Sequence, residues 1–380
     1  MMIPYGRQWI DEDDIEAVAR ALRSDWLTTG PEVEAFERDL AEYTGARYAV
    51  VFSSGTAALH GAYFAAGIGP GDAILTSPVT FAATANAARF LGADVVFADV
   101  DRNTVNLDPA SARERLDRRV KAIVPVDFAG HPADMDAFRQ LASDTGSVLI
   151  SDACHSLGAT YRGRPVGMLA DMTVFSFHPV KGITTGEGGA VVTDDRVFYR
   201  RLVQFRNHGI ERDPEFMADY HGPWYHEMQL LGFNYRLTDI QCALGRSQLA
   251  KLPRFLDRRR EIAARYTEAF ERIEGVTVPA VMPDVQPAWH LYVLRLDPDL
   301  YDRRAVFEAL RERGLGVQVH YIPVYWHPYY RSLGYARGLC PVAEDYYRRC
   351  ISIPLYPALD ESEVQYVIRS VRSVLEAHRK

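Results

Sequence analysis

Four short clusters of polar and small residues contain the side chains in this sequence that could do chemistry. They occupy residues 53–59, 152–155, 173–181 and 184–189. The third cluster is an apolar run that ends in Ser176, His178 and Lys181. An ordinary surface loop explains most lysines in such a place. A lysine whose amine is held neutral is instead a nucleophile that can attack an aldehyde carbon.

The second cluster places Asp152 just after the apolar residues 148–150, with His155 close behind it. An aspartate at such a point is commonly a cap or a turn residue. The alternative is a carboxylate that pairs with the protonated pyridine nitrogen of a cofactor. That contact keeps the ring an effective acceptor of electrons.

The first and fourth clusters are rich in glycine and hydroxyl side chains. Gly55 and Thr56 stand where a strand leads into a helix. Amide groups at a helix start can hold a phosphate, because they are unpaired and the helix dipole favours an anion. An ordinary helix cap would use the same residues. Gly186, Gly188 and Gly189 either let the backbone turn tightly beside a ligand or form a flexible turn.

The order and spacing of the clusters favour the chemical interpretation. Asp152 and Lys181 are 29 residues apart, with one strand unit between them. This arrangement matches the enzymes of fold type I that depend on pyridoxal 5'-phosphate (PLP). The sequence therefore predicts PLP as the cofactor and Lys181 as the residue that binds it covalently.

The segments around these clusters alternate between strand and helix. Apolar runs predict strands at 47–52, 73–77, 94–99, 121–126, 147–152, 172–177 and 189–193. Helices are predicted at 11–23, 31–43, 56–66, 80–91 and 134–145. This alternation predicts a mainly parallel α/β sheet covered by helices on both faces. In such sheets the ligand site lies at the carboxyl ends of the strands, where the polar clusters fall.

The carboxyl-terminal part follows a different pattern. Residues 236–274 are predicted to be helical, with a break at Pro253. Beyond residue 275 we expect a compact α+β unit with strands at 290–296, 316–321 and 350–353 and helices at 303–313 and 361–378. The predicted division is a large PLP-binding α/β domain over residues 1–250 and a small α+β domain over residues 251–380.

Composition excludes several classes of function. The chain has 380 residues and a net charge of -7, which argues against general binding to nucleic acid or to an anionic membrane. Its 4 cysteines are far apart and form no CxxC pair, so neither a metal site nor a disulfide framework is indicated. Reduced cysteines and the lack of an apolar leader predict a cytoplasmic protein.

As a set, the motifs identify a family. The sequence resembles the DegT/DnrJ/EryC1/StrS sugar aminotransferases over nearly its whole length, and the resemblance is carried by residues 54–59, 78–84, 152–159, 175–181, 186–189 and 232–237. It implies an aspartate aminotransferase-like fold and a homodimer with shared active sites. It favours transamination over dehydration, because the relatives that are dehydratases carry histidine at the position of Lys181.

The resemblance also implies a role for each residue around the cofactor. Lys181 would hold PLP covalently and shuttle the proton, while Asp152 would pair with the ring nitrogen. Phe81 would stack on the ring. His155 stands where many relatives carry glutamine near the ring hydroxyl, and a structural core histidine is the alternative there. The implied phosphate ligands are the amides of Gly55 and Thr56, the side chain of Ser176 and, from the neighbouring subunit, Asn234.

Within the family, residues 3–8, 22–31, 178–189 and 318–325 resemble the subgroup that acts in pseudaminic-acid synthesis. The implied reaction moves the amino group of L-glutamate to C4 of a UDP-linked 4-keto-6-deoxy-N-acetylhexosamine. Gly182 departs from the proline expected in that subgroup. Three alternatives stay open: another nucleotide-linked 4-keto or 3-keto sugar, PLP-dependent dehydration or racemisation, and a non-catalytic PLP-binding regulatory protein.

A nucleotide sugar brings a diphosphate to an acidic chain, so local groups must pair with it. The predicted substrate contacts are Arg236, His320, Tyr321 and Tyr325. Packing in a core or an interface is the alternative for the aromatic stretch 325–330.

Overall fold

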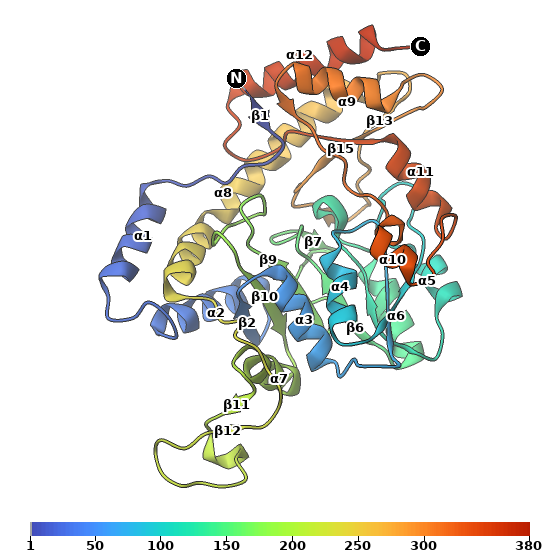
Figure 1. Ribbon diagram of the computed structural model, residues 1–380. Coiled ribbons are helices and arrows are strands. Elements are labelled where there is room, and N and C mark those ends of the chain that lie inside the picture. The colour runs from blue at the N-terminus through green and yellow to red at the C-terminus, as the bar shows by residue number, and fades with distance from the viewer. Residues whose placement is uncertain (1) are drawn as a thin grey trace.

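The computed structural model describes residues 2–380, and a seven-stranded sheet with helices on both faces lies at its centre (Figure 1). In order across the sheet, the strands are β2 (Tyr48–Phe52), β10 (Gly189–Thr193), β9 (Met172–Ser176), β6 (Val148–Asp152), β5 (Val120–Val124), β3 (Ala73–Thr76) and β4 (Asp94–Phe97). Neighbouring strands are parallel, except that β10 runs antiparallel to both β9 and β2. The predicted mainly parallel sheet is confirmed, and each strand overlaps its predicted apolar run.

Alternate residues of each strand face opposite sides of the sheet, and both sides are buried. In β2, for example, Val50 belongs to one core and Val51 to the other. The first side is covered by α3 (Gly55–Ala65), α4 (Ala83–Phe90) and α7 (Arg196–Arg206). The second side is covered by α2 (Pro31–Thr44), α5 (Pro109–Arg115), α6 (Met135–Thr145) and the first half of α8 (Asp239–Phe270). Helix α1 (Glu12–Arg23) packs on α8.

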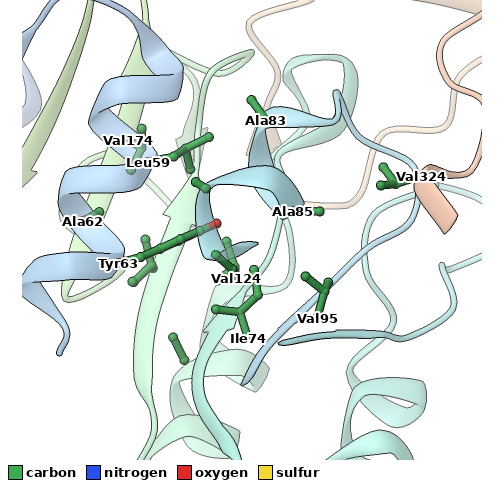
Figure 2. Close-up of a cluster of buried hydrophobic side chains, with 14 of the residues drawn as sticks. Leu59, Ala62, Tyr63, Ile74, Ala83, Ala85, Val95, Val124, Val174 and Val324 are labelled. Carbon is green, nitrogen blue, oxygen red and sulfur yellow. The ribbon is translucent and has the colours of Figure 1, made fainter. Parts of the chain in front are cut away.

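The packing of α3 against α4 organises the first side of the sheet (Figure 2). Leu59 and Tyr63 of α3 are buried, and small residues such as Ala83 and Ala85 let α4 approach closely. The hydroxyl of Tyr63 donates a hydrogen bond of 2.9 Å to the backbone carbonyl of Thr84. The first turn of α4 is thereby tied to α3.

Helix α8 continues past Pro253, so the predicted break is wrong. Pro253 is exposed and cannot donate a helical hydrogen bond, which costs the helix about 3 kcal/mol. Its neighbours Leu252, Phe255 and Leu256 are buried. Each such burial contributes roughly 2 kcal/mol, so packing outweighs the proline. The predicted domain boundary at residue 250 falls inside α8 and stays a prediction.

The carboxyl-terminal part has its own core around a three-stranded antiparallel sheet of β13 (Val276–Thr277), β15 (Tyr292–Leu296) and β17 (Cys350–Ile353). Its helices are α9 (Arg303–Glu312), α10 (Pro328–Ser332), α11 (Pro341–Arg349) and α12 (Glu361–Ala377), of which α10 and α11 are not predicted by the sequence pattern. Strand β1 (Ile3–Pro4) pairs with β16 (Leu315–Gly316), so the amino-terminal residues join this part. The predicted strand 316–321 is wrong beyond Gly316, because only Gln318 finds a strand partner there, in an isolated bridge with Ser352.

An arm of residues 207–234 extends from the body beyond α7 (Figure 1). It contains β11 (Ile210–Glu211) and β12 (Glu227–Met228). The remaining elements are β7 (Thr160–Tyr161), β8 (Arg164–Pro165), β14 (Val285–Gln286) and the short 3-10 helices η1 (Phe128–Gly130), η2 (Pro214–Phe216) and η3 (Val324–Trp326). Among residues 2–380, no helix is both long enough and apolar enough to cross a membrane.

Arg259 of α8 is a buried cation that joins three segments of the chain. Arg259 is 2% exposed, and burial lowers its pKa to about 10. The Nη1 atom donates to the carbonyl oxygens of Trp289 at 3.1 Å and Leu355 at 3.0 Å. Loss of the guanidinium would leave these buried oxygens unpaired.

We expect Arg259→Ala to lower the free energy of unfolding by about 3 kcal/mol, because it creates a cavity and unpaired carbonyl oxygens. Urea denaturation followed by circular dichroism measures the change. Arg260→Ala is the matched control, since this neighbour forms its ion pair with the exposed Asp257 and should cost less than about 1 kcal/mol. Equal losses in the two variants would contradict the structural role of Arg259.

Candidate active site

A cavity of about 480 Å³ lies at the edge of the central sheet where β2, β3, β6 and β9 end. Loops that follow these strands form one wall, and residues of the carboxyl-terminal part form the other. The predicted site residues that line it are Gly55, Thr56, Phe81, Asp152, His155, Ser176, Lys181, His320 and Tyr321. Folding therefore brings most of the predicted site together from distant parts of the sequence.

The start of α3 gives the cavity a wall suited to an anion. Ser54 caps the helix by accepting a hydrogen bond of 3.1 Å from Ala57 N. The amide groups of Gly55 and Thr56, in the first turn, have no partner within the helix. A Cβ atom at position 55 would lie 2.9 Å from Cβ of Ser176, so glycine is needed for this close approach. These donors and the helix dipole favour a phosphate group.

Asp152, at the end of β6, is a buried carboxylate held by uncharged donors. It is 4% exposed. Thr84 Oγ1 donates to Oδ2 at 2.6 Å, and Cys154 N donates to Oδ1 at 3.2 Å. Since these donors are uncharged, they orient the carboxylate without neutralising it. A cationic N–H group that enters the cavity would be a strong partner for it.

Lys181 reaches the same cavity from the loop between β9 and β10. Its backbone N donates to the carbonyl of His178 at 2.8 Å, which closes a turn. Burial lowers the pKa of the Lys181 amine, although the nearby Cys154 and Asp152 act in the opposite direction. At a given pH more of this amine is therefore neutral than in a fully solvated lysine, and the neutral form is the nucleophile.

His155 and His290 form a neutral aromatic wall. Their ring centroids are 4.2 Å apart, and His155 Nε2 lies 3.3 Å from the hydroxyl of Tyr321. Burial, reinforced by the charge of Lys181, lowers the pKa of His155 well below its ordinary value. Burial also lowers the pKa of His290. The Nδ1 atoms of both rings are buried and have no partner among residues 2–380, so each can bind a polar group of a ligand.

Three predicted site residues lie outside this cavity. Tyr325 is fully buried, and its hydroxyl donates to Glu344 Oε1 at 2.7 Å. It is therefore a core residue and not a substrate contact, because its hydroxyl is hydrogen-bonded within the protein and its ring is buried in the core. Arg236 and Asn234 lie at the base of the arm, where Arg236 Nη1 donates to Asn207 Oδ1 at 2.5 Å.

Several cavity residues have no role predicted from the sequence, and three of them come from separate parts of the chain. Tyr5 comes from the amino-terminal segment, Thr84 from α4 and His290 from the segment before β15. Tyr5 and Thr84 belong to runs that resemble known relatives, and this is the signal that could have found them. For His290 the sequence offers no such signal, because a lone histidine in an apolar run is usually a core residue.

Comparison with known proteins extends over almost the whole chain. Residues 8–372 match the sequence profile of the DegT/DnrJ/EryC1/StrS aminotransferase family. Spore coat polysaccharide biosynthesis protein SpsC of Bacillus subtilis is 41% identical over 378 residues, which cover 98% of this chain and 97% of that protein. UDP-4-amino-4,6-dideoxy-N-acetyl-beta-L-altrosamine transaminase of Campylobacter jejuni is 40% identical over 384 residues, which cover 100% of this chain and 99% of that protein. The solved PLP form of putative sugar aminotransferase Spr1654 from Streptococcus pneumoniae has a TM-score of 0.93 at 30% identity and covers 99% of each chain.

The lowered pKa of Lys181 predicts unusual reactivity toward cyanate, which modifies neutral amines. In protein dialysed free of bound small molecules, the carbamylation rate of Lys181 should reach half of its maximum at a lower pH than that of Lys251. In Lys251, burial acts to lower the pKa, but hydrogen bonds to Asp11 and Asp14 outweigh it and the pKa is raised. Peptide mass spectrometry across a pH series measures both midpoints. A midpoint for Lys181 at or above that of Lys251 would show that the cavity does not favour the neutral amine.

Proposed function

Because this chain belongs to the DegT/DnrJ/EryC1/StrS aminotransferase family, we propose that it is a PLP-dependent sugar aminotransferase of fold type I. Its proposed reaction moves the amino group of L-glutamate to C4 of a UDP-linked 4-keto-6-deoxy-N-acetylhexosamine, as in pseudaminic-acid synthesis. One observation carries the proposal: Lys181, Asp152 and an anion-binding helix start share one cavity. The 40% identity to the Campylobacter jejuni transaminase supports the choice of sugar.

The cavity residues fit PLP on two counts. The buried Nδ1 atom of His155 has no partner among residues 2–380, and the ring hydroxyl of PLP would provide one. The close approach of Gly55 to Ser176 leaves amide and hydroxyl donors at a helix start, which suits a phosphate. When bound, PLP supplies a ring that withdraws electrons from the carbon at which the amino group is exchanged.

Each chemical role then falls to a residue whose environment suits it. Asp152 would hold the proton-bearing ring nitrogen. Its own hydrogen-bond donors are uncharged, so its negative charge is left to pair with that nitrogen. Phe81, which is 63% exposed in the structure, provides a flat surface for the ring. Lys181 holds the cofactor covalently. When it is not bonded to the cofactor, the same amine would move a proton at Cα of glutamate and at C4 of the sugar.

The carboxyl-terminal part supplies the sugar side of the site in this proposal. His290, His320 and Tyr321 line that wall. Burial lowers the pKa of His320 to about 4 and that of His290 well below its ordinary value, so both offer neutral hydrogen bonds suited to hydroxyl and acetamido groups. Arg236 and Asn234 lie outside the cavity of their own chain. This supports a homodimer in which each arm contributes to the site of the other subunit.

A second candidate is the same chemistry on another nucleotide-linked keto sugar. The 41% identity to SpsC, whose name refers to spore coat polysaccharide, favours this candidate. Gly182, which replaces the proline expected in the pseudaminic-acid subgroup, favours it too. Dehydration, racemisation and a purely regulatory role are not retained, because the family is one of aminotransferases and Lys181 is present.

We expect Lys181→Ala to lose the visible absorbance band of covalently bound PLP, because Lys181 supplies the amine of the cavity. The visible spectrum of the PLP-loaded variant is the measurement. Lys251→Ala serves as the control and should keep the band. The amine of Lys251 lies outside the cavity and pairs with Asp14 at a distance of 3.0 Å. A band of normal position and intensity in Lys181→Ala would refute the assignment of Lys181.

A spectral assay with glutamate and a panel of sugars tests the reaction. L-Glutamate should bleach the band of the PLP-loaded protein, and the UDP-linked L-arabino 4-keto sugar should restore it. Product analysis by mass spectrometry should then show an amino group at C4. Recovery with a different nucleotide sugar alone would support the second candidate. Failure of glutamate to bleach the band would overturn the proposed aminotransferase reaction.

A further inference from the structure

Two threonine hydroxyls in series hold the carboxylate of Asp152. Thr84 Oγ1 lies 2.6 Å from Asp152 Oδ2, and Thr80 Oγ1 lies 2.7 Å from Thr84 Oγ1. Thr80, Thr84 and Asp152 are 4%, 1% and 4% exposed. Water therefore competes little for these bonds, and the low local dielectric strengthens them.

The chemistry of the three groups fixes the direction of the bonds. An ionised carboxylate can only accept, so Thr84 donates its one hydroxyl proton to Asp152. The carbonyl of Phe81, at 3.3 Å, is a more distant acceptor for the same proton. Thr84 must then accept at the second contact, and Thr80 donates there. A hydroxyl that accepts one hydrogen bond becomes a stronger donor in the next.

The backbone around Thr84 is itself held in place. Its carbonyl accepts the hydrogen bond from Tyr63, whose side chain reaches from α3 toward α4 (Figure 2). Thr80 and Thr84 flank Phe81, which lines the cavity from the same segment. The pair therefore connects the segment that presents Phe81 to the carboxylate of Asp152, although β3 and β6 are separated in the sheet by β5.

We propose that Thr84 is a positioning residue for Asp152 and that Thr80 strengthens its hydrogen bond. This inference rests on the proposed PLP-dependent function. A donor to the carboxylate stabilises its charged form. In a pair with a pyridine nitrogen, the shared proton then resides on the nitrogen, where the proposed chemistry needs it. Thr84 thus both aims Asp152 and keeps the ring nitrogen protonated.

Thr84→Val tests this role, because valine has nearly the shape of threonine but no hydroxyl. We expect the Kd for PLP, measured by titration of the cofactor-free protein, to rise about tenfold, which corresponds to one lost hydrogen bond to a charged group. With PLP labelled at the ring nitrogen, the 15N signal of the bound cofactor should move toward that of the unprotonated ring. Thr84→Ser restores the hydroxyl and should return both readouts to within about threefold of wild type.

Thr76→Val is the matched control for loss of a buried hydroxyl. Thr76 lies in β3, is fully buried, and donates to the carbonyl of Val124 at 2.7 Å instead of to the site. The Thr76→Val substitution should lower the thermal stability without changing the Kd for PLP or the 15N signal. If Thr84→Val does not fold, Thr80→Val removes only the outer donor. It should raise the Kd about two- to threefold and move the 15N signal in the same direction.

The outcomes separate the two levels of the proposal. Wild-type protein that shows neither PLP binding nor a cofactor band would overturn the proposed function. Normal PLP binding by wild type, with an unchanged Kd and 15N signal in Thr84→Val, would overturn the role of Thr84 alone. A defect in Thr84→Val that serine does not restore would also overturn it, since packing of the methyl group would then be the cause.

Discussion

The common direction of β2, β3, β6 and β9 is the constraint on which the site depends. Parallel strands end at one edge of a sheet, so segments that are far apart in the sequence meet there. Asp152 pairs in register with Val174 of β9, close to Ser176 at the end of that strand. The antiparallel strand β10 begins at this edge, with Gly189 opposite Ser176. A register shift of one residue would turn side chains to the other face and take Asp152 out of the cavity.

Burial also determines which groups at this edge are charged. It lowers the pKa of Lys181, so more of this amine is neutral than in a solvated lysine, and it lowers the pKa of His155 well below its ordinary value. Beside them, Asp127 has its pKa raised by burial to about 7 and accepts a hydrogen bond of 2.5 Å from Ser156. The cavity therefore combines one basic amine with neutral imidazoles and the carboxylate of Asp152, which suits a reaction in which a proton is removed from carbon and returned to it.

The strand ends could be predicted from the sequence because each is a local pattern. Apolar runs of the right length identify the strands, and polar residues such as Asp152 and Lys181 follow them. The carboxyl-terminal wall of the cavity could be predicted only in part. His320 and Tyr321 are among the predicted residues and line the cavity, but His290 reaches it only through the packing of the carboxyl-terminal part on the sheet. Tyr325 shows the same limit, because an aromatic stretch has the same pattern whether it faces a cavity or a core. At Pro253 the burial of neighbouring side chains overrides a local propensity, and no local rule contains that information.

The antiparallel course of β10 has a consequence for how this fold can diversify. Because β10 returns directly alongside β9, one short stretch, residues 176–189, delivers Ser176, Lys181 and Glu187 to the cavity with no helix between them. His290 and Tyr321, on the facing wall, come from other segments of the chain. Substitutions on that wall can accumulate while the stretch that carries the lysine stays unchanged. Under the proposed function, evolution can thus exchange one sugar for another at constant cofactor chemistry, and a mutant library for new acceptors belongs on the carboxyl-terminal wall.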